Sequence, residues 1–600
     1  MAETLISPGV LARENDQSFI QQSPVEFGAA IIGPAAKGPV RIPTLVTSFS
    51  EYQAIFGQTV ESQSVEYSYL TSTAANNYFR QGGTSLLVTR VVHGDFSAPF
   101  TSGSTQGSNN TGILNTATSE SFQIQTISEG AVMNNWQSAD SANGTLVSGS
   151  SENVRWEISG VNTGSGTFSL IVRQGNDTLQ QKSVLETFND LSLDPFSANY
   201  IEKVIGNQVF NIRQDGSDFY VQASGSYVNK SKYITVKKVI SPTPNYLDNN
   251  GNISSGSLYS ISGGKLGSNI PFDEFIPVAS SGSFISGSGE NIQAATSPAK
   301  FNQDISNTNI QGLTATDYSS SISLLNNKDD YNFNIIVAPG LIADSTFAAH
   351  ITQVNSLVSL AENRQDCIAV IDVSKYGSTV SATLNSVSAF DSSYAAAYWP
   401  WLQAVDPTSG QTTWSPASAF IPGVYSFTDA SSEPWFAPAG LIRGALGNVI
   451  RAERKLTSGN RDSLYSNNVN PIATFPGRGV VVFGQKTLQN RASALDRVNV
   501  RRLLITLKSF ISQVADNLVF EQNTIATRNN FLSQVNPYLE SVQQRQGLYA
   551  FKVVMNETNN TPDVVDRNEM VGQIYLQPTK TAEFIILDFN VLPTGATFPA

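Results

Sequence analysis

The feature that most constrains the fold is an α/β pattern that stops and then resumes far along the chain. Near the start, buried-strand patterns at 26–39 and 84–92 flank a helical pattern at 48–57. After about residue 331, buried-strand patterns recur at 332–340 and 366–373, with a helical segment between them. Because strands that alternate with helices build parallel sheets, we expect both stretches to form one α/β domain.

The residues between these stretches follow a different sequence pattern. From about 95 to 316, short alternating runs such as VRWEIS, GTFSLIVRQ and SKYITVKKVI are separated by Ser, Gly and Asn turns, which is typical of a β-meander. We therefore predict an α+β multidomain fold, with an α/β core built from both ends of the chain and a β-rich domain inserted into it. The expected divisions are an N-terminal extended arm at 1–25, an α/β middle domain at 26–95 plus 325–440, a β-rich inserted domain at 96–324 in one or two lobes, and a C-terminal domain at 441–600 that ends in a strand arm.

The net charge and its distribution limit the classes of partner that the chain can bind. Only 14% of the 600 residues are charged and the net charge is −12, yet twelve basic and three acidic residues fall between Leu441 and Lys508. Such a chain is poorly suited to coat nucleic acid, but its basic segment can bind one acidic surface. The sequence starts without a secretion signal, and no segment approaches the ~20 apolar residues that cross a bilayer. We expect folding in the cytoplasm and no direct membrane insertion.

Residues suited to catalysis or metal binding are sparse. The histidines, His93 and His350, lie far apart and lack Cys, Asp or Glu at metal-ligand spacing. The sequence contains neither a G-x-S-x-G nucleophile elbow nor a phosphate-binding G-x-x-x-x-G-K-[ST] loop. The single cysteine, Cys367, lies in the apolar run CIAVIDV and is expected to be a buried free thiol. We predict no enzymatic activity, no cofactor and no metal.

The strongest amphipathic helix pattern lies at 495–520. Its apolar residues recur at i, i+3, i+4 and i+7, and its basic residues cannot all share that face. The side chains expected to point outward are those of Arg497, Arg501, Arg502 and Lys508. Farther along, AEFIILDFNV at 582–591 is a strand pattern with no following strand to pair with.

The segment PWFAPAGLIRGAL at 434–446 is apolar but carries no nucleophile, metal ligand or acid–base pair. We place it where the α/β domain meets the C-terminal domain. Trp435 and Phe436 are expected to wedge the two domains together, while Gly440 and Gly444 allow close backbone approach. The segment is therefore interpreted as domain packing rather than as a substrate site.

Taken in order, several segments resemble the tail sheath protein of contractile-tailed bacteriophages. They are SPGVLARE at 7–14, IIGPAAKGPVRIPTLVTSFSEYQAIFG at 31–57, YFRQGGTSLLVTRV at 78–91, PWFAPAGLIRGAL at 434–446, NVNPIATFPGRGVVVFGQKTL at 468–488 and DRVNVRRLLITL at 496–507. The resemblance covers about the first ninety and the last 270 residues. One departure is SPASAFIPGVYSFTD at 415–429, where the family more often has a Pro-Pro-Ser-Gly turn.

The resemblance implies a structural subunit of the phage tail, assembled in the host cytoplasm. Subunits would stack in rings, expected to be sixfold, around a tail tube protein, with baseplate and tail terminator proteins at the ends. Contraction would drive the tube through the bacterial envelope for genome delivery, and the inserted domain would decorate the exterior.

The resemblance also suggests two contact regions. Terminal arms could add strands to a neighbour's sheet, and the basic helix could face the tube. The arm candidates are Leu5, Ile6, Val10, Leu11, Ile585, Leu587, Phe589 and Val591. The alternatives are that both arms pair within their own subunit, and that the basic helix is a solvated face or binds carboxylates of a neighbouring sheath domain.

Two other functions remain open from the sequence. A tailocin or another phage-derived injection system would use the same subunit. A surface adhesin with a glycan-binding β domain would instead need an export signal.

Overall fold

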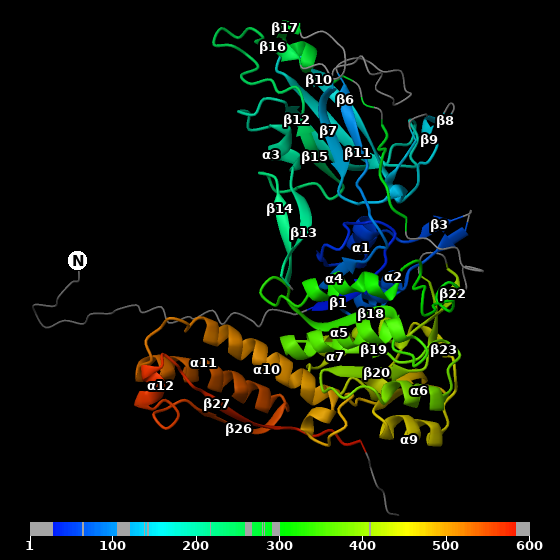
Figure 1. The fold of residues 1–600 in the computed structure, drawn as a ribbon, viewed down its shortest axis with the longest axis vertical. Coiled ribbons are helices and arrows are strands. Elements are labelled where there is room, and N and C mark those ends of the chain that lie inside the picture. Colours follow the sequence, from blue (N-terminus) through cyan, green and yellow to red (C-terminus); the bar gives the residue numbers. More distant parts are fainter. Residues whose placement is uncertain are drawn as a thin grey trace, which may run out of the picture.

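In the computed structural model, an eight-stranded sheet forms the centre of the molecule (Figure 1). The residues that the structure describes are 28–62, 65–104, 120–136, 139–140, 143–216, 218–258, 267–278, 280, 282–290, 300–406 and 410–583. The sheet has the order β2-β5-β1-β18-β19-β20-β24-β25. Its strands are β2 (Thr44–Val46), β5 (Leu86–Arg90), β1 (Gly28–Gly33), β18 (Phe333–Ile342), β19 (Ile368–Asp372), β20 (Ala395–Trp399), β24 (Val469–Phe475) and β25 (Gly479–Val482).

Strand direction explains the continuous apolar runs in the sequence. The six inner strands from β5 to β24 pair in parallel, and only β2 and β25 at the edges are antiparallel. Along β1, Ala30 and Ile32 join one hydrophobic cluster while Ala29 and Ile31 join another, as the two-residue period of a strand requires. Both faces are therefore covered, as expected for a parallel sheet.

Helices cover the two faces of this sheet. α5 (Ala348–Arg364) packs on β18 and β19, whereas α2 (Leu70–Arg80) lies against β1, β18 and α7 (Ile421–Ser431). The first helix, α1 (Phe49–Phe56), begins at Ser48, whose hydroxyl accepts a hydrogen bond from the Glu51 amide, and ends at Gly57. Cys367 is buried in the sheet core as a free thiol, which confirms the prediction, and burial raises its pKa.

Two predicted domain boundaries are wrong. β24 and β25 complete the central sheet, so the α/β domain extends well beyond the expected end at 440. At the other boundary, Ile310, Leu313 and Ile322 already pack in the core of the α/β domain, which therefore begins before 325. Both errors arose because short apolar segments do not reveal which sheet they join.

The described residues between Phe100 and Phe284 form a β-rich block with a hydrophobic cluster of its own (Figure 1, upper part). Its main sheets have the orders β10-β11-β12 and β15-β7-β6. The strands of these sheets are β10 (Val154–Asn162), β11 (Thr167–Gln174), β12 (Val184–Ser192), β15 (Ile234–Val239), β7 (Glu120–Thr126) and β6 (Phe100–Ser104). The sequence runs VRWEIS, GTFSLIVRQ and SKYITVKKVI are strands, as predicted.

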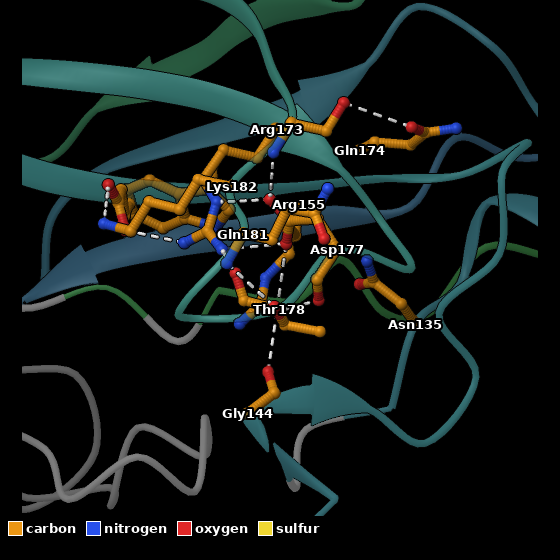
Figure 2. Close-up of polar contacts among 12 residues, drawn as sticks. Asn135, Gly144, Arg155, Arg173, Gln174, Asp177, Thr178, Gln181 and Lys182 are labelled. Atoms are coloured by element: carbon orange, nitrogen blue, oxygen red, sulfur yellow. Dashed lines mark hydrogen bonds and ion pairs between the residues drawn. The ribbon is translucent and has the colours of Figure 1, made fainter.

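A buried ion-pair network fixes one end of this block (Figure 2). Arg173 donates from Nε and Nη2 to the two carboxylate oxygens of Asp177, at 2.7 and 2.8 Å, and from Nη1 to Glu157 at 2.7 Å. Arg155 donates to the Gly144 carbonyl at 2.8 Å. Because these partners come from separate strands and turns, the network holds the turn after β11 against β10.

The β-rich block is also tied to the central domain through buried charges. Arg90, at the end of β5, donates from Nη1 to the carbonyls of Gly38 (2.6 Å) and Glu129 (2.8 Å). Lys37 donates to the Glu152 carbonyl at 3.0 Å and pairs with its carboxylate. An unpaired buried charge is costly, so these contacts favour a fixed attachment of the block.

The C-terminal part is a helical hairpin beside a two-stranded sheet. α10 (Val498–Asp516) packs on α11 (Ile525–Gln544), and the sheet pairs β26 (Leu548–Val554) with β27 (Gln573–Pro578). A short helix, α12 (Pro562–Asp566), joins the two strands. The predicted amphipathic helix is confirmed, since Leu503, Leu507 and Val514 lie in the core of this unit. Among the described residues, no helix combines the length and apolar character needed to span a membrane.

Candidate assembly surfaces

The first half of α10 docks on the central domain through its arginines. Arg502 donates to both carboxylate oxygens of Asp429 in α7, at 2.7 and 2.5 Å, and its guanidinium lies 4.8 Å from the centre of the Tyr425 ring. Burial raises the pKa of Asp429, although Arg502 opposes this effect. Arg501 donates to the Ser393 carbonyl at 3.1 Å and stacks over Tyr394 at 3.9 Å.

The prediction that these arginines point outward is wrong for Arg501 and Arg502, whose exposed fractions are 3% and 4%. Helix periodicity places them away from the apolar face that packs on α11, but a second surface, the central domain, covers that side. The other two basic residues are more accessible: Arg497 is half-buried and Lys508 is exposed. Lys508 still donates to the side chain of Gln365 at 2.9 Å.

Arg497 anchors the last described residues of the chain. It donates from Nε and Nη2 to the carboxylate of Glu583, at 2.7 and 3.0 Å. Tyr465 and Gln485 of the central domain donate to the same carboxylate at 2.9 and 3.1 Å. Burial acts to raise the pKa of Glu583, but these hydrogen bonds outweigh it, and the pKa lies below the ordinary value.

The apolar segment at 434–446 does lie at the junction of the central and C-terminal domains. Trp435 is buried in the C-terminal hydrophobic cluster and donates from Nε1 to the Arg545 carbonyl at 3.0 Å. Phe436 packs at the edge of the same cluster. At Gly444, a Cβ would lie 2.6 Å from the Val482 carbonyl oxygen, so close backbone approach requires glycine. At Gly440 a Cβ would meet nothing, and glycine is needed there because φ is +90°.

The predicted arm residues all lie outside the described residues, since these begin at 28 and end at 583. A possible acceptor for such an arm is described, namely the sheet of β26 and β27. Within the described part of the chain, each of these strands pairs only with the other. Phe551, Val553 and Ile574 contact the C-terminal cluster, while Tyr549 and Tyr575 are exposed. Sequence reasoning missed this acceptor because it considered only the donor strands.

The titratable groups inside the central domain have structural partners. His350 accepts a hydrogen bond at Nδ1 from the Ile342 amide, and burial lowers its pKa to about 4. Asp372 accepts hydrogen bonds from the amide and hydroxyl of Ser418, at 3.1 and 2.5 Å, and burial raises its pKa to about 6. Among the described residues, no three His, Cys, Asp or Glu side chains are grouped so as to hold a metal ion.

The described residues form a multidomain α+β protein that exposes sheet edges and apolar side chains. Comparison with known families shows which proteins the chain resembles. Residues 311–488 match the model described as phage tail sheath protein central domain, and 491–592 match the phage tail sheath C-terminal domain. Over most of residues 311–592, the chain is therefore similar to phage tail sheath proteins. The division between the two matches also agrees with a central domain that includes β24 and β25.

Curated relatives carry the same description. The tail sheath protein of Vibrio phage KVP40 is 33% identical in an alignment of 319 positions, and the match covers 47% of this chain and 46% of that protein. The tail sheath protein of Enterobacteria phage T4 is 31% identical over 303 residues, covering 48% and 46%. The matched part thus spans about half the length of these relatives. A solved sheath tail protein from Listeria innocua is 11% identical with a TM-score of 0.47, and the match covers 92% of this chain and 95% of that one.

Proposed function

We propose that this chain is the structural subunit of a contractile tail sheath. Copies polymerise around an inner tail tube and contract to drive the tube through the bacterial envelope during genome delivery. The observation that carries the proposal is the succession of both sheath domains, at 311–488 and 491–592, in one chain. In this proposal the free energy for contraction is stored during assembly and released by a shift between lattice arrangements.

The β26–β27 sheet supports a role for strand exchange. An unpaired strand edge offers a row of backbone donors and acceptors that another chain can complete. Each added hydrogen bond contributes only about 1 kcal/mol net, but a lattice repeats the link many times. We assign the donor strands to the two terminal arms, residues 1–25 and the segment after Glu583. Arg497 holds Glu583, and we assign the C-terminal arm to the residues that follow it.

The arrangement of the domains suggests how each subunit is oriented. In Figure 1 the β-rich block lies above the central sheet and the C-terminal domain lies beside it, at the lower left. We place the C-terminal domain next to the tube and the β-rich block on the exterior. Rings of six subunits, a tail tube protein, and baseplate and terminator proteins at the ends complete the proposal. Assembly takes place in the host cytoplasm and the product is part of the virion.

Of the four basic residues assigned to the tube, Lys508 is the most accessible. Arg501 and Arg502 are withdrawn from that role because their guanidinium groups are buried inside the chain. Arg497 is engaged with Glu583 and Asp496. Any electrostatic contact with the tube is therefore weaker than four free cations would give, which suits a contact that must break during contraction.

Electron microscopy of the purified chain tests the proposal. We expect hollow tubes to form on concentration, whereas a uniform population of monomers under all conditions would contradict the sheath assignment. A variant that ends at Glu583 keeps every described residue but lacks the proposed C-terminal arm. It should remain folded by circular dichroism and fail to form tubes. If this variant forms normal tubes, the C-terminal arm is not an intersubunit link.

A further inference from the structure

The turn between α10 and α11 presents large apolar side chains to solvent. Phe520 is fully exposed, and the exposed fractions of Val519 and Ile525 are 59% and 60%. We call these three residues the apolar knob. Singly exposed apolar residues are common, but three within residues 519–525 make an exposed apolar stretch of the kind that marks interaction sites.

The knob is held in place by its surroundings. Phe520 has a φ of +71°, a conformation that is uncommon for a bulky residue. The same turn is fixed by Asn523, whose side chain donates to the Glu569 carbonyl at 2.8 Å and contacts the buried Asn560. Exposure of the phenyl ring is therefore a property of an ordered turn, and the strained backbone points to a role for the ring.

A second exposed apolar cluster lies at the opposite end of α10. It consists of Leu441 and Ile442 in α8 (Gly440–Arg443) and Phe483 just after β25, and we call it the apolar patch. The two elements meet where the Val482 amide donates to the Gly444 carbonyl at 2.8 Å. Ile442 is 80% exposed. The patch continues the segment PWFAPAGLIRGAL, whose first half is used for domain packing.

Charge distinguishes the two clusters. Between Asp516 and Ile525 the chain has the exposed acidic residues Asp516 and Glu521 and no Lys or Arg. Between Leu441 and Phe483 it has six basic and two acidic residues. Arg461 lies over the Phe483 ring at 5.9 Å, and Arg478 is exposed nearby in the sequence. The chain segment that carries the knob is thus acidic, whereas the segment that carries the patch is predominantly basic.

One chain cannot bring its own knob and patch together. The patch lies near the start of α10, because Phe483 is two residues from Gln485, whose carbonyl accepts from the Val498 amide at 2.8 Å. The knob follows the end of the same helix. α10 has 19 residues, so the two clusters are separated by about 28 Å of rigid helix.

We propose that the apolar knob of one copy docks on the apolar patch of a second copy. The contact pairs different surfaces on the two copies, so it repeats from subunit to subunit and can link subunits within a ring or between stacked rings. The opposite charges of the two segments orient the encounter, and burial of the Phe520 ring supplies affinity. The inference rests on the proposed self-assembly and names one contact within it.

The first test compares two exposed phenylalanines. Phe520→Ser should raise the protein concentration needed for tube formation at least tenfold, which corresponds to about 1.4 kcal/mol per contact. Phe196→Ser, which alters a 73% exposed phenylalanine of the β-rich block, should leave that concentration unchanged. If Phe520→Ser assembles like the wild type, the knob contact is wrong while the sheath proposal stands. If the wild type itself never assembles, the sheath proposal fails.

The second test identifies the partner surface. Phe520→Cys protein and Ile442→Cys protein are mixed, assembled and oxidised, with the native Cys367 buried and unreactive. We expect a covalent dimer in the mixture and not in either variant alone. Cross-linking of Phe520→Cys to added tube protein, or tubes without any Phe520–Ile442 dimer, would overturn the proposal. A mixture of Phe196→Cys protein with Ile442→Cys protein is the matched control and should give no dimer.

Discussion

The two ends of α10 use opposite chemistry. At its start, Arg501 and Arg502 are buried against the central domain and bonded to Ser393 and Asp429. Beyond its end, the apolar side chain of Phe520 is fully exposed. The usual rule places charge outside and apolar groups inside, and the helix reverses it at both ends. We call these ends the root and the tip of α10.

This reversal gives the two ends of α10 different roles. The root holds the domains of one subunit together, and the tip is available for contact with another subunit. Buried ion pairs and Trp435 hold the C-terminal domain on its own subunit, where water is excluded and the partners are fixed. The tip makes no such internal contact through Phe520 and remains available to another chain. A sheath subunit needs both properties, because its domains must stay joined while its lattice contacts change. Changes at the root should therefore alter stability, and changes at the tip should alter assembly.

Among the substitutions at the root, Trp435→Ala should lower the free energy of unfolding most. Removal of a buried tryptophan typically costs about 3–5 kcal/mol, and here the hydrogen bond to the Arg545 carbonyl is lost as well. Unfolding by denaturant measures the effect. It is monitored by circular dichroism of the backbone, because that signal does not depend on the tryptophan that is removed. A loss below about 1 kcal/mol would show that Trp435 does not join the two domains.

Arg502→Ala should have the second largest effect, a loss of about 2–3 kcal/mol in the free energy of unfolding. The substitution leaves the carboxylate of Asp429 half-buried without its cation. The double variant Arg502→Ala/Asp429→Ala should recover part of this loss, because no unpaired charge remains. Additive losses in the two single variants would contradict a direct pair.

Glu583→Gln should cost about 1–2 kcal/mol at pH 7, because it weakens the charged hydrogen bonds from Arg497. The folded-state pKa of Glu583 is lowered, so its contribution is present above the ordinary glutamate value of 4.5 and is lost as the pH falls through the folded pKa. The difference in unfolding free energy between wild type and variant should therefore shrink on acidification. A difference that is independent of pH would show that the ionised carboxylate is not the bonded form.

Phe520→Ser should have the smallest effect on the isolated chain, below about 0.5 kcal/mol, because the ring makes no buried contact. Phe196→Ser, which alters another exposed phenylalanine, is the matched control and should behave in the same way. Thermal unfolding of the unassembled variants measures both. A marked loss for Phe520→Ser alone would mean that the tip, too, serves the stability of its own subunit.

Much of the fold follows from the sequence, because its strands and helices carry strong local patterns. The buried runs around Ile31, Val337 and Val370 predict the parallel sheet, and the apolar period around Leu503 predicts α10. The assignment of β24 to the C-terminal domain was wrong because strand pairing across 70 residues leaves no local signal. The sequence does show that PWFAPAGLIRGAL joins two domains.

The contact surfaces were harder to predict. Periodicity identified the helix face that packs on α11, but it could not show that the central domain covers Arg501 and Arg502 from the other side. The signal was present in Asp429, an acidic residue at the end of an apolar helix, but only the tertiary fold pairs it with Arg502. The knob was missed for the opposite reason, since an apolar residue after an amphipathic helix is normally read as part of the core.

Hydroxyl-radical footprinting of the free chain and of its assembled form tests the separation of root and tip most directly. Both states are oxidised briefly and each side chain is quantified by mass spectrometry. The account predicts rapid oxidation of Phe520 in the free chain and strong protection in the assembly, with Trp435 protected in both. Equal oxidation of Phe520 in the two states, or exposure of Trp435 in the free chain, would contradict it.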